Sequence, residues 1–170
     1  AQINPAINKQ MIDQALSWLD IQANDTILDL FCGFGNFTLP MARQAGHVTG
    51  IELNPAAIQR AGENAQLNQI DNAEFITADL TQDLQQFKLS HKQFAKVLLD
   101  PPRSGAKEVL AWLTQFEPER IVYVSCNTAT LARDLGYLVN EAHYTLEKIG
   151  IMDMFSHTRH IESMALLTRS

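Results

Sequence analysis

The sequence predicts a doubly wound α/β fold, in which a mostly parallel sheet is covered by helices on both faces. Short apolar runs typical of buried strands alternate with longer stretches of helical periodicity. The runs are nearly continuous, as expected for parallel strands that are buried on both faces. The 170 residues match the length of one domain, so we expect a single domain over residues 1–170.

The helices and strands can be assigned in order along the chain. Asn4 and Pro5 are typical of a helix start, and apolar residues at helical spacing continue this helix to about residue 19. Strands are expected over residues 26–31, 47–53, 73–77, 95–99 and 120–125. Helices are expected between them over residues 36–45, 55–68, 106–115 and 128–139. This alternation of strand and helix predicts βαβ units.

The carboxyl-terminal part departs from this alternation. Two apolar stretches, residues 144–152 and 161–168, are separated only by the polar stretch 153–160. No helix is expected between them, so we predict an antiparallel hairpin at the end of the sheet. Residues 82–92 are polar and are expected to form a loop or a frayed helix.

The composition excludes several classes of protein. No apolar run approaches the roughly 18–20 residues that a membrane span needs, so we expect no membrane association. The two cysteines, Cys32 and Cys126, are too few for a disulfide framework, and the Cys and His spacing fits no zinc finger. We therefore expect no metal site and a reducing compartment. The absence of a secretory leader in this sequence predicts a cytoplasmic protein.

The charge limits how this chain can meet nucleic acid. Its formal net charge is −6 and its pI is about 5.3. A protein that binds RNA by electrostatics alone needs clustered lysine and arginine side chains. The chain also begins without methionine. We therefore expect that this chain is a fragment of a longer protein and that any tight binding of nucleic acid is due to another part of that protein.

A glycine-rich turn follows the first expected strand and is the clearest local signal. Gly33 and Gly35 let the backbone turn tightly and approach a ligand, at the strand edge where open α/β sheets bind their ligands. The third glycine of a GxGxxG motif is missing, which weakens the case for a pyrophosphate site. A plain strand-to-helix turn is the alternative. Cys32, inside the turn, is expected to be a packing residue.

Acidic residues follow the next strands. Glu52 ends the second strand, where a carboxylate can accept hydrogen bonds from both hydroxyls of a ribose. Asp79 follows the third strand and could meet the edge of an adenine. Asp100 opens the segment Asp-Pro-Pro-Arg-Ser-Gly, whose prolines stiffen a turn beside the cleft. These residues predict a nucleoside-containing cofactor; the alternatives are a surface carboxylate, a helix N-cap and a structural turn, respectively.

Cys126 and Glu162 are the candidates for covalent and acid–base chemistry. Cys126 lies between a strand and a helix N-terminus, whose amides and dipole favour a thiolate. Glu162 lies at the start of the last strand and could act as a base. A buried inert cysteine and a solvated carboxylate remain the alternatives for each residue judged alone. His157 and His160 could bind a metal, but two histidines on a loop are more often ordinary polar residues.

Taken together, these segments resemble the RNA uracil-5-methyltransferase family, which uses S-adenosylmethionine. The resemblance covers essentially the whole chain and is carried by residues 2–4 (QIN), 29–40 (DLFCGFGNFTLP), 100–105 (DPPRSG), 124–133 (VSCNTATLAR) and 153–164 (DMFSHTRHIESM). It implies a Rossmann-like class I methyltransferase fold with S-adenosylmethionine as cofactor. By this resemblance Cys126 is the nucleophile and Glu162 is the base. The positions that match the family's cofactor site are Gln2, Phe31, Asn36, Glu52, Asp79 and Asp100.

The resemblance also implies an RNA substrate. It favours 23S ribosomal RNA, with tRNA as the alternative. Three departures blur this choice: Phe34 replaces the more usual methionine, Arg103 belongs to a segment nearer the tRNA-modifying branch, and Arg159 stands where glycine is common. Family members also carry an RNA-binding TRAM domain, and the ribosomal branch usually an iron–sulfur cluster. We expect both only in an upstream part of the protein, and we expect the protein to be a monomer.

The implied reaction gives these residue types a chemical reason. Carbon 5 of uracil is a poor nucleophile, but addition of a thiolate to carbon 6 gives an enolate that can take a methyl group. A base must then remove the proton on carbon 5. The rivals are a nicotinamide-dependent oxidoreductase, a non-catalytic S-adenosylmethionine-binding module, an amino-methyltransferase and, remotely, a zinc hydrolase. The missing third glycine and the presence of Cys126 and Glu162 disfavour the oxidoreductase.

Overall fold

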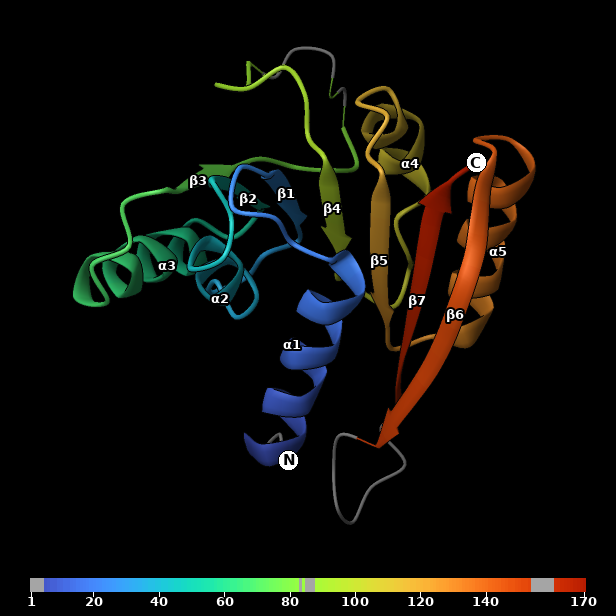
Figure 1. Cartoon of the computed structure of the whole chain (residues 1–170), viewed down its shortest axis with the longest axis horizontal. Coiled ribbons are helices and arrows are strands. Elements are labelled where there is room, and N and C mark those ends of the chain that lie inside the picture. Colours follow the sequence, from blue (N-terminus) through green and yellow to red (C-terminus); the bar gives the residue numbers. More distant parts are fainter. Residues whose placement is uncertain (1–4, 83, 85–87, 154–160) are drawn as a thin grey trace.

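The computed structural model describes residues 5–82, 84, 88–153 and 161–170. Within these residues the chain forms a seven-stranded sheet with the strand order β3-β2-β1-β4-β5-β7-β6 (Figure 1). The strands are β1 (Thr26–Leu30), β2 (His47–Glu52), β3 (Ala73–Thr77), β4 (Lys96–Leu99), β5 (Arg120–Ser125), β6 (Tyr144–Asp153) and β7 (Ile161–Arg169). The helices are α1 (Pro5–Leu19), α2 (Thr38–Ala42), α3 (Pro55–Leu67), α4 (Lys107–Thr114) and α5 (Thr128–Asn140).

The sheet is parallel from β3 to β5 and changes direction at β7. β3, β2, β1, β4 and β5 pair in parallel, whereas β7 runs antiparallel to both of its neighbours, β5 and β6. The chain moves outward from β1 to β3 and then returns to the other side of β1 at β4. Such a switch point leaves a crevice at the carboxyl ends of the strands. The predicted doubly wound fold and its carboxyl-terminal hairpin are therefore confirmed.

Helices cover both faces of the sheet because strand side chains alternate between two apolar layers. Ile27 and Leu98 pack with buried side chains of α1 and α2 on one face. Leu28 and Leu99 point to the other face, where α4 and α5 complete the second apolar layer. Figure 1 shows α1 and α5 on opposite sides of the sheet. Each fully buried leucine or isoleucine contributes about 1.5–3 kcal/mol relative to an exposed one, so both layers stabilise the frame that carries the strand ends.

Most helix boundaries follow from the residue types at the ends. The Asn54 side chain accepts hydrogen bonds from the amides of Ala56 and Ala57, and Pro55 fixes the first turn of α3. The helix predicted over residues 36–45 is too long, because α2 covers only Thr38–Ala42. Its first predicted residues belong to the glycine turn, and the last ones turn back toward β2.

A buried ion pair lies at the opposite end of the strands from the crevice. The Nζ atom of Lys96 lies 2.7 Å from Oδ2 of Asp25, and both residues are buried. Removing one partner of such a pair is strongly destabilising, since the other charge is left in poorly hydrated surroundings.

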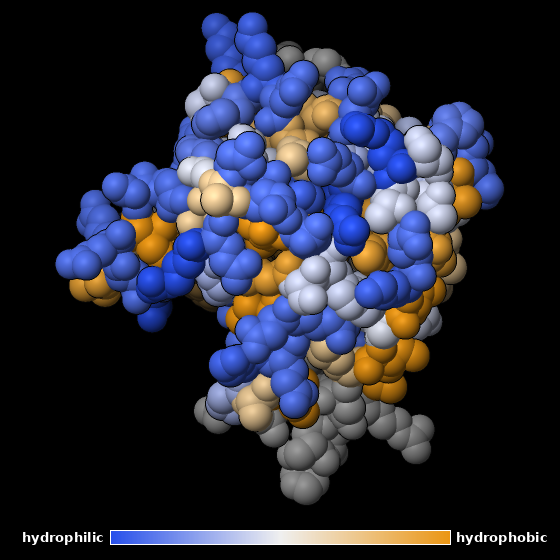
Figure 2. Space-filling view, viewed as in Figure 1, coloured by the Kyte–Doolittle hydropathy of each residue, from blue (hydrophilic) through white to orange (hydrophobic). Residues whose placement is uncertain are grey.

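The outer surface is polar over most of the face shown in Figure 2, with apolar patches near the middle of this face and on the side that carries β6 and β7. Ile149, Ile151 and Ile161 of these two strands are all exposed. No helix in the described part of the chain is both long and apolar enough to span a membrane.

Candidate active site

The glycine turn after β1 is built from backbone conformations that few residues adopt. Gly33 and Gly35 have φ values of +56° and +90°, in the left-handed region that glycine favours. Phe31 also lies in this region, with φ of +63°, although it carries a side chain. Such a conformation costs on the order of 1–3 kcal/mol and persists only where the surroundings impose it. The turn is pinned to β2, because the Cys32 amide donates to the Ile51 carbonyl at 3.0 Å.

Glu52 joins the end of β2 to this turn. Its Oε1 accepts a hydrogen bond from the Gly33 amide at 3.2 Å, and its Oε2 accepts one from the Asn54 amide at 2.8 Å. Each carboxylate oxygen offers two lone-pair directions, so each retains one for a further donor. The hydrogen bonds from the two backbone amides therefore fix the orientation of the Glu52 carboxylate, which can still accept hydrogen bonds from two neighbouring hydroxyls.

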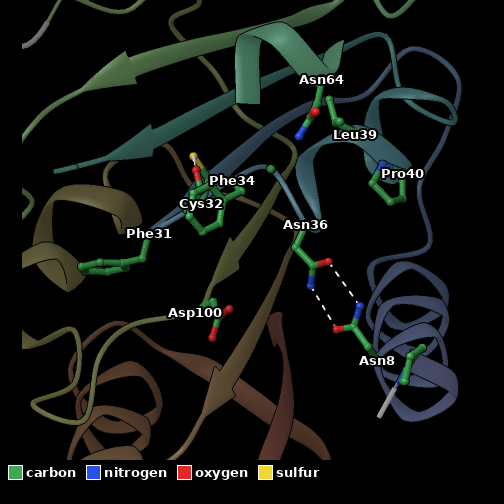
Figure 3. Close-up of a pocket in the computed structure, with 12 residues that line it drawn as sticks. Asn8, Phe31, Cys32, Phe34, Asn36, Leu39, Pro40, Asn64 and Asp100 are labelled. Atoms are coloured by element: carbon green, nitrogen blue, oxygen red, sulfur yellow. Dashed lines mark hydrogen bonds between the residues drawn. The ribbon is translucent and has the colours of Figure 1, made fainter. Parts of the chain in front are cut away.

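Two cavities share Phe31 in their walls. The glycine-turn cavity has a volume of about 700 Å³ and lies between the turn and the start of α1, with Asp100 also in its wall (Figure 3). The Glu52 slot has a volume of about 330 Å³ and is mainly apolar. The slot is lined by Phe31, Glu52, Leu53, Ala78, Asp79, Leu80, Thr81 and Pro102. These surfaces suit a ligand with a flat apolar part, a ribose and a polar tail.

Asp79 lies in the wall of the Glu52 slot and is held by a local turn. Its Oδ1 accepts hydrogen bonds from the hydroxyl of Thr81 at 2.6 Å and from the amide of Thr81 at 2.9 Å. These bonds lower the pKa of Asp79, the hydroxyl more than the amide. Asp79 is therefore ionised at neutral pH and can only accept hydrogen bonds from a ligand in the slot.

Two further carboxyl groups lie in poorly hydrated surroundings beneath the cleft. Asp29 is fully buried, and its Oδ2 accepts a hydrogen bond from the Thr38 hydroxyl at 2.5 Å. Burial raises the pKa of Asp29 to about 7. Loss of hydration, followed by the charges of Glu162 and Asp29, raises the pKa of Asp100 to about 8. A cation bound nearby would favour the ionised forms of both groups.

Helix α5 holds the loop that follows β4. The Arg103 carbonyl accepts hydrogen bonds from the Asn127 side-chain amide at 3.1 Å and from the Thr130 hydroxyl at 3.0 Å. The Ser104 carbonyl accepts one from the Arg133 guanidinium, also at 3.0 Å. The loop is therefore fixed to α5 by side chains as well as stiffened by its prolines.

Strand pairing brings Cys126 and Glu162 together from distant parts of the chain. In the antiparallel pair of β5 and β7, Ser125 lies opposite Ser163. Cys126 directly follows Ser125, and Glu162 directly precedes Ser163, so the two residues continue the same register at the carboxyl end of β5. The charge of Glu162 acts on both the Cys126 thiol and the Asp100 carboxyl. The candidate nucleophile, the candidate base and the cleft carboxyl therefore lie close together at one edge of the sheet.

A third cavity, the Cys126 pocket, has a volume of about 320 Å³ and opens beside this thiol. It is lined by Arg103, Cys126, Asn127, Thr128, Ile151, Ile161 and Ser163. Ile151 and Ile161 are 70% and 48% exposed, so they form apolar walls that are open to solvent. The pocket therefore combines a thiol, a guanidinium and apolar walls.

The surroundings of Cys126 raise the pKa of its thiol. Burial and then the charge of Glu162 raise its pKa, while Arg103 and a backbone hydrogen bond lower it by less. Burial and the neighbouring carboxylates thus oppose the thiolate that the helix N-terminus is expected to favour. Cys32 is buried, and burial raises its pKa far above the ordinary value, in keeping with a packing residue.

The structure gathers most of the predicted site residues at one edge. The two cavities at Phe31 are lined by the predicted cofactor residues Phe31, Gly33, Gly35, Asn36, Glu52, Asp79 and Asp100. Gln2, His157 and His160 lie outside the described residues. In the described ranges, no cluster of three Asp, Glu, His or Cys side chains is arranged to hold a metal ion.

These cavities are also lined by three residues that the sequence motifs do not predict: Asn8, Leu53 and Asn64. Asn8 follows Pro5 by three residues and therefore lies on the same helix face, and Pro5 also lines the glycine-turn cavity. The sequence alone does not show that this face meets a cavity. Leu53 directly follows Glu52, and an apolar residue there is exposed in the open slot.

Comparison with known proteins agrees with this geometry. The family model for tRNA (Uracil-5-)-methyltransferase matches residues 1–170. The chain is 54% identical over 168 residues to the 23S rRNA (uracil(1939)-C(5))-methyltransferase RlmD of Methylococcus capsulatus. It is 48% identical over 169 residues to the protein of the same name from Vibrio parahaemolyticus. Both matches cover 99% of this chain, which spans only 38% of the length of each relative.

Solved structures place the fold among methyltransferases. The Pyrococcus abyssi tRNA (uracil-54, C5)-methyltransferase, in complex with S-adenosyl-L-homocysteine, matches with a TM-score of 0.79 and 33% identity over 95% of this chain and 38% of that protein. Magnesium protoporphyrin IX methyltransferase from Synechocystis, with bound S-adenosylhomocysteine, matches with a TM-score of 0.75 and 17% identity, covering 100% of this chain and 89% of that one. The second likeness concerns the class I methyltransferase fold alone. With the family model matching from end to end, the chain belongs to the tRNA (uracil-5-)-methyltransferase family.

Proposed function

We propose that this domain binds S-adenosylmethionine and transfers its methyl group to carbon 5 of a uridine in RNA. One observation carries the proposal: the Ser125–Ser163 pairing, which sets Cys126 beside Glu162 at the sheet edge where Glu52 ends β2. A thiol and a carboxylate side by side are the two groups that methylation of a pyrimidine carbon requires. The substrate we propose is 23S rRNA, in keeping with the names of the 54% identical relatives.

The residues around the two cavities fit the proposed cofactor. Glu52 keeps one acceptor position on each oxygen for the two ribose hydroxyls. The apolar walls of the Glu52 slot suit an adenine ring, with Asp79 at its edge. A Cβ atom on Gly33 would meet no atom within 4 Å, so the cavity is open where a ligand would approach the turn. We assign the remaining contacts to Gln2, Phe31, Gly35, Asn36 and Asp100.

The carboxyl groups of the cleft favour a positively charged ligand. When bound, S-adenosylmethionine supplies an electrophilic methyl group on a sulfonium centre. Asp29 and Asp100 have raised pKa values, about 7 and about 8, so a cation within a few ångströms would be stabilised as they ionise. The product is uncharged at sulfur and would gain less from these groups, which favours its release.

The Cys126 pocket fits the pyrimidine. In the proposed reaction the Cys126 thiol loses its proton to solvent, and the thiolate adds to carbon 6 of the uracil. The electron pair of the 5,6 double bond then forms a bond from carbon 5 to the methyl group, whose bond to the sulfonium sulfur breaks. Glu162 then removes the proton from carbon 5, and the electrons released expel the sulfur from carbon 6. Arg103 favours both the thiolate and the enolate, because its guanidinium charge already lowers the pKa of Cys126. Ile151 and Ile161 offer apolar contact to the ring.

The proposal also concerns the whole protein. We infer that residues 1–170 form one catalytic domain of a longer protein, since the matched relatives are much longer than this chain. We further propose that the protein is monomeric and cytoplasmic. A net charge of −6 opposes binding to RNA phosphates, so other parts must supply much of the RNA affinity. We place a TRAM domain and an iron–sulfur cluster in the upstream part.

Two measurements test the proposed function. Calorimetry of this chain with S-adenosylhomocysteine and with NADH should show binding of the first alone; binding of NADH alone would instead support a nicotinamide-dependent oxidoreductase. Mass spectrometry of RNA from cells that lack the full-length protein should show a lost 5-methyluridine in 23S rRNA. A loss from tRNA would support the second candidate, which the 33% identity to the tRNA-modifying enzyme favours.

A further inference from the structure

A reciprocal pair of side-chain amides joins α1 to the glycine turn. The Nδ2 atom of Asn8 donates to Oδ1 of Asn36 at 3.3 Å, and the Nδ2 atom of Asn36 donates to Oδ1 of Asn8 at 3.2 Å. Figure 3 shows the two amides facing each other at one side of the glycine-turn cavity. Both residues line this cavity. The pair therefore connects the two segments that enclose it.

The reciprocal geometry fixes the orientation of the Asn8 and Asn36 amides relative to each other. Each primary amide has two N–H donors and two lone pairs, and the pair uses one of each. A flip of one amide alone would place N–H against N–H and oxygen against oxygen, so the two amides keep complementary orientations. Asn36 is exposed, and in the described part of the chain its side-chain hydrogen bonds both go to Asn8. With Asn8 in place, the Asn36 amide therefore retains one N–H donor and one oxygen lone pair for a ligand.

Both ends of the pair are held in place. Asn8 lies one helical turn before Met11, which is buried, and Ala15 and Leu16 continue the same buried face of α1. Asn36 directly follows Gly35, whose φ of +90° fixes the direction of the turn. A hydrogen bond between two held segments costs little further entropy, so the pair is a specific contact.

We propose that Asn8 is a positioning residue for the amino-acid end of the cofactor. By fixing Asn36, it presents one N–H donor and one oxygen acceptor toward the glycine-turn cavity. A carboxylate and an ammonium group are the matching partners, and the α-amino-acid part of S-adenosylmethionine carries both. The inference rests on the proposed function, since it assigns the amino-acid end of that cofactor to this cavity.

The test compares two ligands that differ only at this end. Calorimetry would measure the affinity of this chain for S-adenosylhomocysteine and for 5′-methylthioadenosine, which shares the nucleoside and the sulfur but lacks the amino acid. Asn8→Ala should weaken binding of S-adenosylhomocysteine about fivefold, the equivalent of one ordinary hydrogen bond, and leave 5′-methylthioadenosine binding unchanged. Asn8→Leu, which keeps the side-chain size, should act in the same way.

Two controls separate a positioning role from a structural one. Alanine and leucine are better helix formers than asparagine, so neither variant should weaken α1, and thermal unfolding without ligand checks this. Gln10→Ala changes an exposed residue of α1 outside the cavity and should leave both affinities unchanged. The variant Asn8→Ala/Asn36→Ala should bind S-adenosylhomocysteine as weakly as Asn36→Ala alone, because Asn8 acts through Asn36.

Several results would overturn the assignment. Wild-type affinity of Asn8→Ala for S-adenosylhomocysteine, additive losses in the double variant, or equal losses for both ligands would each remove the positioning role while the proposed function stands. Failure of the wild-type chain to bind either ligand would instead refute the proposed function itself.

Discussion

The cofactor cleft and the Cys126 pocket lie at the same edge of the sheet, but they are assembled over different distances along the chain. In the cleft, the Gly33 amide reaches the Glu52 carboxylate across a separation of 19 residues, between two neighbouring parallel strands. The Cys126 pocket joins the ends of β5 and β7, and β7 reaches β5 only by inserting between it and β6. The cleft is thus a local structure, whereas the pocket needs the completed sheet.

This difference implies that the two regions can be damaged separately. Changes in the Cys126 pocket should leave cofactor binding intact, because the glycine turn and Glu52 hold each other without it. Changes in the cleft should weaken cofactor binding without altering the register that places Cys126 beside Glu162.

The largest expected effect is at Cys126, the proposed nucleophile. Cys126→Ala in the full-length enzyme should reduce methylation at least about 10³-fold, since removal of a covalent nucleophile leaves only binding and orientation. The affinity of the same variant for S-adenosylhomocysteine should stay within about twofold of the wild-type value. Cys126 does not line the glycine-turn cavity or the Glu52 slot. A methylation rate near that of the wild type would remove Cys126 from the mechanism.

The next effect separates methyl transfer from the removal of the carbon 5 proton that follows it. Glu162→Gln keeps the size of the side chain but cannot accept the carbon 5 proton, so turnover should slow by about 10²–10⁴-fold. Methyl transfer can still occur, and a covalent protein–RNA adduct should accumulate on a denaturing gel. Normal turnover without an adduct would shift the search for the base to Asp100 and His160.

A smaller effect is expected in the cleft. Glu52→Ala removes the proposed acceptor of two ribose hydroxyls and the anchor of the Gly33 amide, so affinity for S-adenosylhomocysteine should fall by about 10–100-fold. Glu63→Ala, which removes an exposed carboxylate of α3, is the matched control and should change nothing. Equal affinities for Glu52→Ala and the control would exclude Glu52 from the site.

The same contrast explains what could be read from the sequence. The order of strands and helices, the hairpin and the glycine turn could be predicted, because the residue types of each short segment indicate its own backbone conformation. Three features could not: the left-handed φ of Phe31, the partnership of Asn8 with Asn36, and the raised pKa of Cys126. Each depends on neighbours supplied by the tertiary fold, and burial in particular is not visible in a local pattern.

Gly105, in the loop between the two regions, can be compared with Gly62, in the helix α3. A Cβ on Gly105 would lie 2.5 Å from Nη2 of Arg133 and 2.8 Å from Oδ2 of Asp134, at a φ of +83°. Gly105→Ala should therefore lower the free energy of unfolding by about 1–2 kcal/mol. Gly62→Ala, within α3 and with no atom within 4 Å, should raise it by about 0.5–1 kcal/mol. Urea denaturation measures both, and effects of the same sign would contradict the described loop geometry.

The last expected effect concerns the pH dependence of the buried carboxyl beneath the cleft. Burial raises the pKa of Asp29 from 3.8 to about 7, so the folded chain holds this proton more tightly than the unfolded chain does. The stability that Asp29 contributes is therefore complete below about pH 4 and declines as the pH rises to about 7. The substitution Asp29→Asn removes this titration, because the amide keeps the shape of the neutral carboxyl and can still accept a hydrogen bond from the Thr38 hydroxyl.

The free energy of unfolding of Asp29→Asn, minus that of the wild type, should thus grow between about pH 4 and pH 7 and stay constant above that range. Denaturation curves at several pH values measure the difference directly. A constant difference across the range would mean that Asp29 does not titrate near neutral pH in the folded chain. Asp100 is present in both proteins, so its own titration largely cancels in the difference. The remaining pH dependence reports the titration of Asp29, at a position away from the paired ends of β5 and β7.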